Sequence, residues 1–167
     1  MPSSDQGVTR NRYTLIPRTL IFLTRGERVL LLIGAPHKRL WANRYNGVGG
    51  HIERGEDVLD SARRELAEET GLGAPDLWLC GVITVDTGQD TGIGIYVFKG
   101  ESLTSDVHPS SEGRLEWVAF SEVLEKPLVE DLYQLLPRVL QMHRGDPPFS
   151  AYYQYDEHPT RPASLVE

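Results

Sequence analysis

The chain has 167 residues, of which 40% are hydrophobic and 25% are charged, and its formal charge is −7. This composition is that of a globular protein long enough to bury a core. The acidic balance argues against a groove for DNA or RNA, because binding to a nucleic-acid polymer generally needs a basic face. It still allows a small anionic substrate, since a bound metal ion reverses the local field.

The sequence also limits the redox chemistry and the compartment. Cys80 is the sole cysteine, which excludes an internal disulfide and a cysteine zinc cluster, and its apolar neighbours predict a small buried side chain. The N-terminus lacks the charged start and apolar core of a signal peptide. The longest apolar run, 29–33, is too short to span a bilayer. We therefore expect a soluble cytoplasmic protein without a membrane partner.

The first third of the chain predicts a β-hairpin and a long loop. Residues 1–11 are polar and are expected to be flexible. Residues 18–24 and 28–33 are apolar runs on either side of a short polar turn, the pattern of a hairpin. Pro17 has no N–H to donate, so it predicts a sheet edge or an early break in the first strand.

The loop at 34–46 interleaves basic and aromatic side chains, among them Lys38, Arg39, Trp41 and Arg44. Such side chains can hold phosphates and stack on a base. An ordinary surface loop, with Trp41 packed onto the core, is an equally good interpretation.

The most informative stretch follows this loop and predicts a helix. Asp57 is a suitable N-cap and Gly71 stands where a left-handed glycine ends a helix. Between them Glu65, Glu68 and Glu69 stand at i, i+3 and i+4, so the three carboxylates share one helix face. Apolar residues at helical spacing lie beside them, which places the acidic face at the edge of the buried surface.

Three carboxylates on one face indicate a metal site. At an effective dielectric near 20 and a separation of about 6 Å, repulsion approaches ~3 kcal/mol per pair. A hard divalent cation removes this repulsion, and carboxylate oxygens are ligands that suit Mg²⁺ or Mn²⁺. A solvated acidic face is the alternative, and it is the commoner explanation for three glutamates considered alone.

The rest of the chain predicts elements of both kinds. The expected strands are 78–87, 93–98, 115–120 and 149–155. The expected helices are 121–124 and 129–143, and Pro137 should kink or break the second helix or mark a later start. The segment 102–113 is expected to be irregular and 156–167 to be a flexible tail. No repeat or linker divides the sequence, so residues 1–167 are expected to form one domain of the α/β class.

The stretch from Gly50 to Leu72 resembles the signature of the Nudix hydrolases. That signature reads Gly, five residues, Glu, seven residues, Arg-Glu-aliphatic, any residue, Glu-Glu, any residue, Gly-aliphatic. Its fixed positions are filled here by Gly50, Glu56, Arg64, Glu65, Leu66, Glu68, Glu69, Gly71 and Leu72. A match at nine positions is far more specific than a short glycine motif. The resemblance implies the Nudix fold, an α-β-α sandwich with a mixed β-sheet and the signature helix against one face.

The resemblance also implies roles at the site. Glu65, Glu68 and Glu69 would bind the metal, and Glu65 is also a candidate for the base that activates water. The backbone carbonyl of Gly49 would be a further ligand. Arg64 would hold the glutamates in place by pairing with Glu56.

Two other parts of the chain extend the resemblance. Glu112, followed five positions later by Trp117, is similar to a segment of nucleoside-triphosphate-cleaving members, which implies a further metal ligand; a solvated loop glutamate is the alternative. Residues 44–50, together with the late stretches 130–133 and 149–153, resemble 8-oxo-dGTP diphosphatases of this family. This narrower resemblance implies base contacts from Asn46, Glu130 and Asp131. Trp41 and Tyr45 are the aromatic side chains expected to be available for stacking on the base.

The resulting hypothesis is a Mg²⁺-dependent pyrophosphohydrolase, with Mn²⁺ as the alternative ion. Its substrate would be a nucleoside diphosphate linked to another group, above all a purine nucleoside triphosphate, including an oxidised one. Hydrolysis of ADP-ribose is the second hypothesis, although that subgroup tends to carry a proline beyond the signature and residues 82–94 contain none. A nucleotide sensor without catalysis is the third, but such modules need not retain the acidic residues that this chain keeps. The expected partner is a small nucleotide rather than a nucleic-acid polymer.

Overall fold

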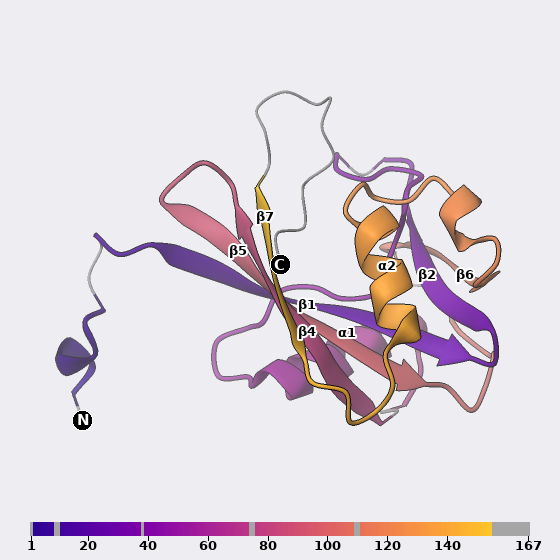
Figure 1. The fold of residues 1–167 in the computed structure, drawn as a ribbon, viewed down its shortest axis with the longest axis horizontal. Coiled ribbons are helices and arrows are strands. Elements are labelled where there is room, and N and C mark those ends of the chain that lie inside the picture. The colour runs from indigo at the N-terminus through magenta and orange to yellow at the C-terminus, as the bar shows by residue number, and fades with distance from the viewer. Residues whose placement is uncertain (1, 9–10, 38, 74–75, 109–110, 155–167) are drawn as a thin grey trace.

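A computed structural model describes residues 2–8, 11–37, 39–73, 76–108 and 111–154. A mixed β-sheet lies between two helices, α1 (Val58–Thr70) and α2 (Leu132–Gln141) (Figure 1). Ala62 and Leu66 of α1 pack in one buried apolar cluster, whereas Leu135 of α2 belongs to another. The alternation of buried side chains along the first strand supplies both clusters, because successive residues point to opposite faces of a sheet.

The sheet has seven strands, in the order β3-β2-β1-β5-β4-β7, and β6 pairs with β2. The pairs β1–β5 and β4–β7 are parallel, while β1–β2, β2–β3, β2–β6 and β4–β5 are antiparallel. The predicted α/β class with a mixed sheet is therefore confirmed. The strands are β1 (Thr14–Arg25), β2 (Arg28–Gly34), β3 (Tyr45–Asn46), β4 (Leu77–Asp86), β5 (Thr91–Glu101), β6 (Gly113–Ala119) and β7 (Phe149–Gln154).

Helix α1 begins and ends where its capping residues predict. The Asp57 carboxylate accepts hydrogen bonds from the N–H groups of Leu59 at 2.8 Å and Asp60 at 3.0 Å. At the other end Gly71 has a φ of 70°, and its N–H donates to the carbonyl of Ala67. Both caps satisfy backbone groups that a helix end otherwise leaves without partners.

The expected break at Pro17 is wrong, because β1 continues through it. Pro17 pairs in parallel register with Gly94 of β5, and its carbonyl accepts a hydrogen bond from the N–H of Ile52 on the other side. The N–H and C=O of one strand residue point to the same side. The missing donor of Pro17 therefore faces the segment 48–52 and not β5, and the ladder between β1 and β5 is intact.

The predicted hairpin is confirmed only next to its turn. Arg25 pairs with Arg28, and the two strands stay paired for one further residue. The segment 48–52 then lies along β1 instead: the N–H of Ile21 donates to the carbonyl of Val48 at 2.7 Å, and the N–H of Thr19 to Gly50 at 2.9 Å. These bonds fix the glycine-rich turn against β1.

Strand β5 is longer than the predicted strand at 93–98, because it continues to Glu101. Lys99 lies within this extension and is 7% exposed. Its ammonium donates to the carbonyls of Leu140 at 2.9 Å and Met142 at 2.7 Å, at the end of α2. Burial lowers the pKa of Lys99. The buried lysine thus joins the sheet to the last turn of α2.

Helix α2 is shorter than predicted and continues through Pro137. The segment before it is held by β3: the N–H of Tyr45 donates to Pro127 at 3.0 Å, and the N–H of Val129 donates to the Tyr45 carbonyl at 2.9 Å. This pairing keeps 127–129 extended, so the helix begins only at Leu132. The short helix expected at 121–124 is a 3₁₀ turn at Val123–Glu125.

Two segments expected to be irregular contain local structure. Strand β3 lies inside the predicted loop at 34–46. Ser3–Gln6 form a 3₁₀ helix within the N-terminal segment, closed by a hydrogen bond from the Asp5 N–H to the Pro2 carbonyl. The predicted flexible tail, 156–167, falls outside the described residues. Among the residues described, no helix is long and apolar enough to cross a membrane. The one-domain interpretation stays a prediction.

Candidate active site

A cleft of about 850 Å³ collects most of the residues that the sequence singles out. Helix α1 and neighbouring loops supply its acidic part, whereas β4, β5 and α2 supply its apolar part. The glutamates that line the cleft are Glu53, Glu65, Glu68, Glu69 and Glu112, and Asp131 lines it at the start of α2. The apolar ones include Ile83, Val85, Ile93, Ile95, Val129, Leu132 and Leu135. One cleft therefore offers charged oxygen ligands and an apolar surface together.

The turn at Gly49 and Gly50 joins the two parts and requires glycine. Gly49 has a φ of 149°, and a Cβ on it would lie 2.2 Å from the carbonyl oxygen of Thr19. A Cβ on Gly50 would lie 2.5 Å from the carboxylate of Glu65. The absence of side chains thus lets this turn lie directly against both β1 and a glutamate of α1.

The three α1 glutamates differ in exposure. Glu69 is 6% exposed, and its Oε2 accepts a hydrogen bond from the Gly49 N–H at 3.1 Å. The side chains of Glu65 and Glu68 are 14% and 60% exposed. The acidic face therefore runs from the buried turn to the surface, at the edge of the apolar stripe.

Arg64 connects the glutamates to one another. It forms a two-point contact with Glu56, Nε to Oε1 at 2.5 Å and Nη2 to Oε2 at 2.9 Å. Its Nη1 also donates to Glu65 at 2.8 Å and to Glu68 at 3.2 Å. The hydrogen bond from Arg64 lowers the pKa of Glu56 to about 2. The pairing of Arg64 with Glu56 is confirmed, while the catalytic roles of both residues stay a prediction.

The donors at this site fit a hard divalent cation. Carboxylates and the adjoining backbone carbonyls are oxygen ligands, and the bare Gly50 lets the Glu65 carboxylate approach the turn. Within the described chain, no three His, Cys, Asp or Glu side chains are grouped closely enough to hold a metal by themselves. Backbone, water or phosphate oxygens would therefore have to complete the coordination, as Mg²⁺ commonly requires.

The predicted base-contacting residues are only partly brought together. Asn46 and Asp131 line the cleft, as does Trp41, which is 42% exposed. Glu130 lines a smaller adjoining hollow of about 200 Å³, which also contacts Trp41 and Asp131. The structure thus groups Asn46 with Asp131 and places Glu130 outside the main cleft.

Tyr45 does not lie in the cleft, so its expected role in stacking is not supported. It is 8% exposed, and its hydroxyl donates to Glu116 at 2.9 Å. Lys126 contacts the other oxygen of Glu116 at 3.0 Å. Burial, followed by the bond to Glu116, raises the pKa of Tyr45. This side chain is part of the packing between β3, β6 and the segment before α2.

Comparison with known proteins identifies the family. Residues 14–139 match the family model described as NUDIX domain. The chain belongs to the NUDIX domain family. Oxidized purine nucleoside triphosphate hydrolases of Mus musculus and Danio rerio are both 28% identical to it, over 143 and 141 residues. These alignments cover 85% and 84% of this chain and 88% and 86% of the two relatives.

Solved structures share the Nudix fold. The MutT protein from Bacillus halodurans matches with a TM-score of 0.73 at 25% identity, over 92% of this chain and 95% of that chain. The NUDIX domain of Shewanella oneidensis NrtR, solved with ADP ribose, matches with a TM-score of 0.68 at 16% identity, over 84% and 98%. The chain is thus a Nudix hydrolase, from a family that acts on nucleotide phosphoanhydride bonds and generally uses a divalent metal.

Sequence reasoning missed several residues of the Nudix cleft. Thr19, His51 and Tyr153 line it beside the predicted residues. A signal for Tyr153 is present in β7, where Phe149, Ala151 and Tyr153 alternate with exposed residues. That period of two places a tyrosine hydroxyl on a buried face, where phenylalanine would suffice for packing.

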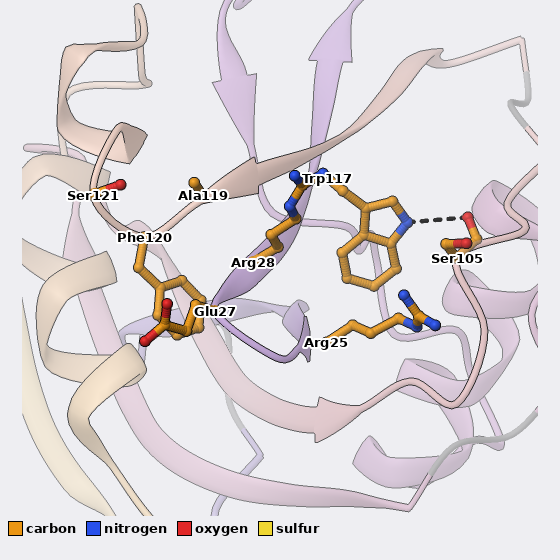
Figure 2. A pocket seen from close by; sticks show the side chains of 8 residues that line it. All are labelled: Arg25, Glu27, Arg28, Ser105, Trp117, Ala119, Phe120 and Ser121. Carbon is orange, nitrogen blue, oxygen red and sulfur yellow. Dashed lines mark hydrogen bonds between the residues drawn. The ribbon is translucent and has the colours of Figure 1, made fainter.

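A second hollow lies at the other end of β1, around the β1–β2 turn, and has a volume of about 580 Å³. Figure 2 shows Arg25 and Arg28 there beside Trp117, whose indole N–H donates to the Ser105 carbonyl at 3.1 Å. Among the described residues lining it, Glu27 is the carboxylate, and none is a predicted site residue. The carboxylates of the Nudix signature therefore distinguish the larger cleft as the candidate active site.

Proposed function

We propose that this Nudix hydrolase uses Mg²⁺ to cleave purine nucleoside triphosphates, including oxidised ones, into a nucleoside monophosphate and pyrophosphate. The observation that carries the proposal is the set of residues that line the cleft beside α1. Carboxylates of α1 lie next to a glycine turn, and an apolar floor with two polar side chains, Asn46 and Asp131, adjoins them. A triphosphate would occupy the acidic part together with the metal, and a purine would cover the apolar part.

In this proposal Glu65, Glu68, Glu69 and Glu112, which are not grouped closely enough to hold a metal by themselves, would bind it together with the Gly49 carbonyl and with water or phosphate oxygens. When bound, the metal neutralises charge on the phosphate oxygens and lowers the pKa of water. Mn²⁺ offers the same oxygen chemistry and is the alternative ion. Arg64 and Glu56 act as positioning residues, because Arg64 contacts three carboxylates and does not line the cleft.

The reaction adds one water across the phosphoanhydride bond between the α- and β-phosphates. The water oxygen bonds to one phosphorus, the bridging oxygen leaves with the other, and the released proton passes to a base. Glu65 is the proposed base. Its carboxylate lies against Gly50 and is held by Arg64 at 2.8 Å, so its orientation is fixed before substrate binds.

The base would be recognised in the apolar part of the cleft. Trp41, held with a left-handed φ of 60°, lines this part and is proposed to stack on the purine. Asn46 and Asp131 are proposed to hydrogen bond to its edge. The Asn46 Oδ1 already accepts from the Gly47 N–H at 2.8 Å, which orients the amide beside the glycine turn. The two relatives named oxidised purine nucleoside triphosphate hydrolases support this choice of substrate.

Replacing Glu69 by glutamine tests the metal site. Glutamine keeps the oxygen that accepts from Gly49 but removes the charge, so folding should persist while Mg²⁺-dependent hydrolysis falls at least about 100-fold. Glu125→Gln, an exposed substitution outside the cleft, is the matched control and should keep full activity. Turnover of the Glu69→Gln protein close to the wild-type rate would contradict the assignment.

The substrate is tested in the same assay. Initial rates for 8-oxo-dGTP, dGTP, dCTP and ADP-ribose at equal concentration should be highest for the purine triphosphates, with pyrophosphate as the second product. Faster cleavage of ADP-ribose than of every triphosphate would favour the nucleotide-sugar hypothesis. Binding of a nucleotide with no turnover at any divalent metal would instead favour a sensor.

A further inference from the structure

The hydroxyl of Tyr153 is a buried polar group that packing leaves without a partner. Tyr153 is 1% exposed and lines the cleft, and its hydroxyl forms no hydrogen bond within the described chain. A buried hydroxyl without a partner costs free energy, so each case needs a specific explanation. A phenylalanine would fill the same space without that cost. The oxygen is therefore the feature that packing does not explain.

The position of Tyr153 indicates that its hydroxyl can contact a ligand in the cleft. It lies on the buried face of β7 and pairs with Val85 of β4, which is itself part of the cleft floor. Burial, and then the nearby charge of Asp131, raises the pKa of Tyr153 to about 12. The phenol therefore keeps its proton at neutral pH and is able to donate a hydrogen bond.

We propose that the Tyr153 hydroxyl determines base specificity by donating a hydrogen bond to a keto oxygen of the bound base. The inference rests on the proposed function, because it assumes that the apolar part of the cleft holds a nucleobase. Tyr153 supplies a donor and the neighbouring Asp131 carboxylate an acceptor. That pair complements a lactam edge, in which a keto oxygen adjoins a ring N–H, as in guanine. The corresponding edge of adenine carries an amino donor beside a bare ring nitrogen and has the opposite polarity.

Tyr153→Phe tests this inference without any need for catalysis. Binding of GMP and AMP to the metal-free protein is measured by titration calorimetry. Loss of one hydrogen bond should weaken GMP binding about fivefold to tenfold and leave AMP within about twofold. The thermal midpoint of the ligand-free variant should hold or rise, because a buried hydroxyl without a partner has been removed. A hydroxyl that makes a stabilising hydrogen bond in the ligand-free fold would instead lower that midpoint.

Tyr152→Phe is the matched control on the same strand. Its hydroxyl donates to Asp86 at 2.7 Å, and its side chain is on the opposite face of β7, 39% exposed. Removing this hydroxyl should not change the ratio of GMP to AMP affinity. If monophosphates bind too weakly for calorimetry, the same ratio is obtained from kcat/KM for dGTP and dATP.

The outcomes separate this inference from the proposed function. An active triphosphatase whose GMP to AMP ratio is unchanged by Tyr153→Phe overturns the role of Tyr153 alone. A variant that loses the same affinity for GMP as for AMP also overturns the role of Tyr153 alone. A protein that shows the predicted change in ratio but cleaves no triphosphate supports the role of Tyr153 and contradicts the proposed reaction. A wild-type protein that acts on adenine but not guanine nucleotides overturns the role of Tyr153 alone, and one that neither binds nor cleaves any purine nucleotide overturns both.

Discussion

At the scale of single residues, Arg64 is a cation that contacts carboxylates of the signature helix. Its guanidinium contacts Glu56, Glu65 and Glu68, and so offsets part of the repulsion among carboxylates on one helix. A planar guanidinium suits this task, since it can donate to several carboxylates in fixed directions. Lysine at this position would be a poor replacement.

The Arg64–Glu56 contact predicts a pH dependence of stability. Its hydrogen bonds lower the pKa of Glu56 from 4.5 to about 2 in the folded protein. A carboxyl with a lowered folded pKa adds stability above its unfolded pKa and loses it as the pH falls toward the folded value. Relative to Glu56→Gln, the wild-type advantage should thus be constant near neutrality and shrink between pH 4.5 and about 2.

Urea unfolding of wild type and Glu56→Gln at several pH values measures this difference. Glu125→Gln serves as the control, because its carboxylate is exposed and makes no contact with Arg64. A wild-type advantage that stays the same down to pH 2 would show that the charge of Glu56 has no part in the contact.

At the scale of elements, the end of α1 depends on Gly71. Its left-handed φ of 70° is unfavourable for residues with a Cβ, and an added Cβ would also lie 3.0 Å from the His108 ring. We expect Gly71→Ala to lower the free energy of unfolding by about 1–2 kcal/mol. Thermal or urea unfolding measures this. Gly73→Ala is the matched control, with no atom within 4 Å of the new methyl group. Equal stability of the two variants would contradict the capping role of Gly71.

The sequence pattern predicted correctly those elements whose ends are fixed by hydrogen bonds between residues close together in the sequence. Asp57 and Gly71 mark the two ends of α1, and both act through hydrogen bonds within a few residues along the chain. Elements fixed by distant partners were predicted less well. Strand β5 continues through Lys99 because β1 pairs beside it, and α2 begins late because β3 holds the segment before it. Neither reason is present in the residues of the element itself.

The site shows the same division. The spacing of Glu65, Glu68 and Glu69 placed their carboxylates on one face, and the family resemblance implied the Arg64–Glu56 pair. Tyr45 and Tyr153 could not be assigned in that way. Both are buried aromatic residues on strands, and only the packing of other strands and of α2 decides which of them lines the cleft.

At the scale of the whole molecule, metal binding should stabilise the fold. An ion that binds the folded chain alone raises the free energy of unfolding by about 2.7 kcal/mol at 100 times its Kd. Mg²⁺ should therefore raise the thermal midpoint of the wild-type protein, and EDTA should reverse the change. The Glu69→Gln protein should show a much smaller rise. Without metal, its midpoint should equal or exceed that of wild type, because one repelling charge is gone. An identical response of both proteins to Mg²⁺ would contradict a metal site at Glu69.

The parallel pairings also determine when the cleft can exist during folding. The glycine turn, β1 and α1 are all formed from the first half of the chain, which is synthesised first. The apolar floor can form only after the second half has been synthesised, because its strands pair with distant segments. Leu20 of β1 pairs with Val97 of β5, and Ile83 of β4 pairs with Ala151 of β7. Closing such long loops is entropically costly, and folding rates fall as contacts become less local. A nascent chain therefore contains the residues of α1 and their glutamates well before the strands that form the apolar, base-binding part of the cleft have paired.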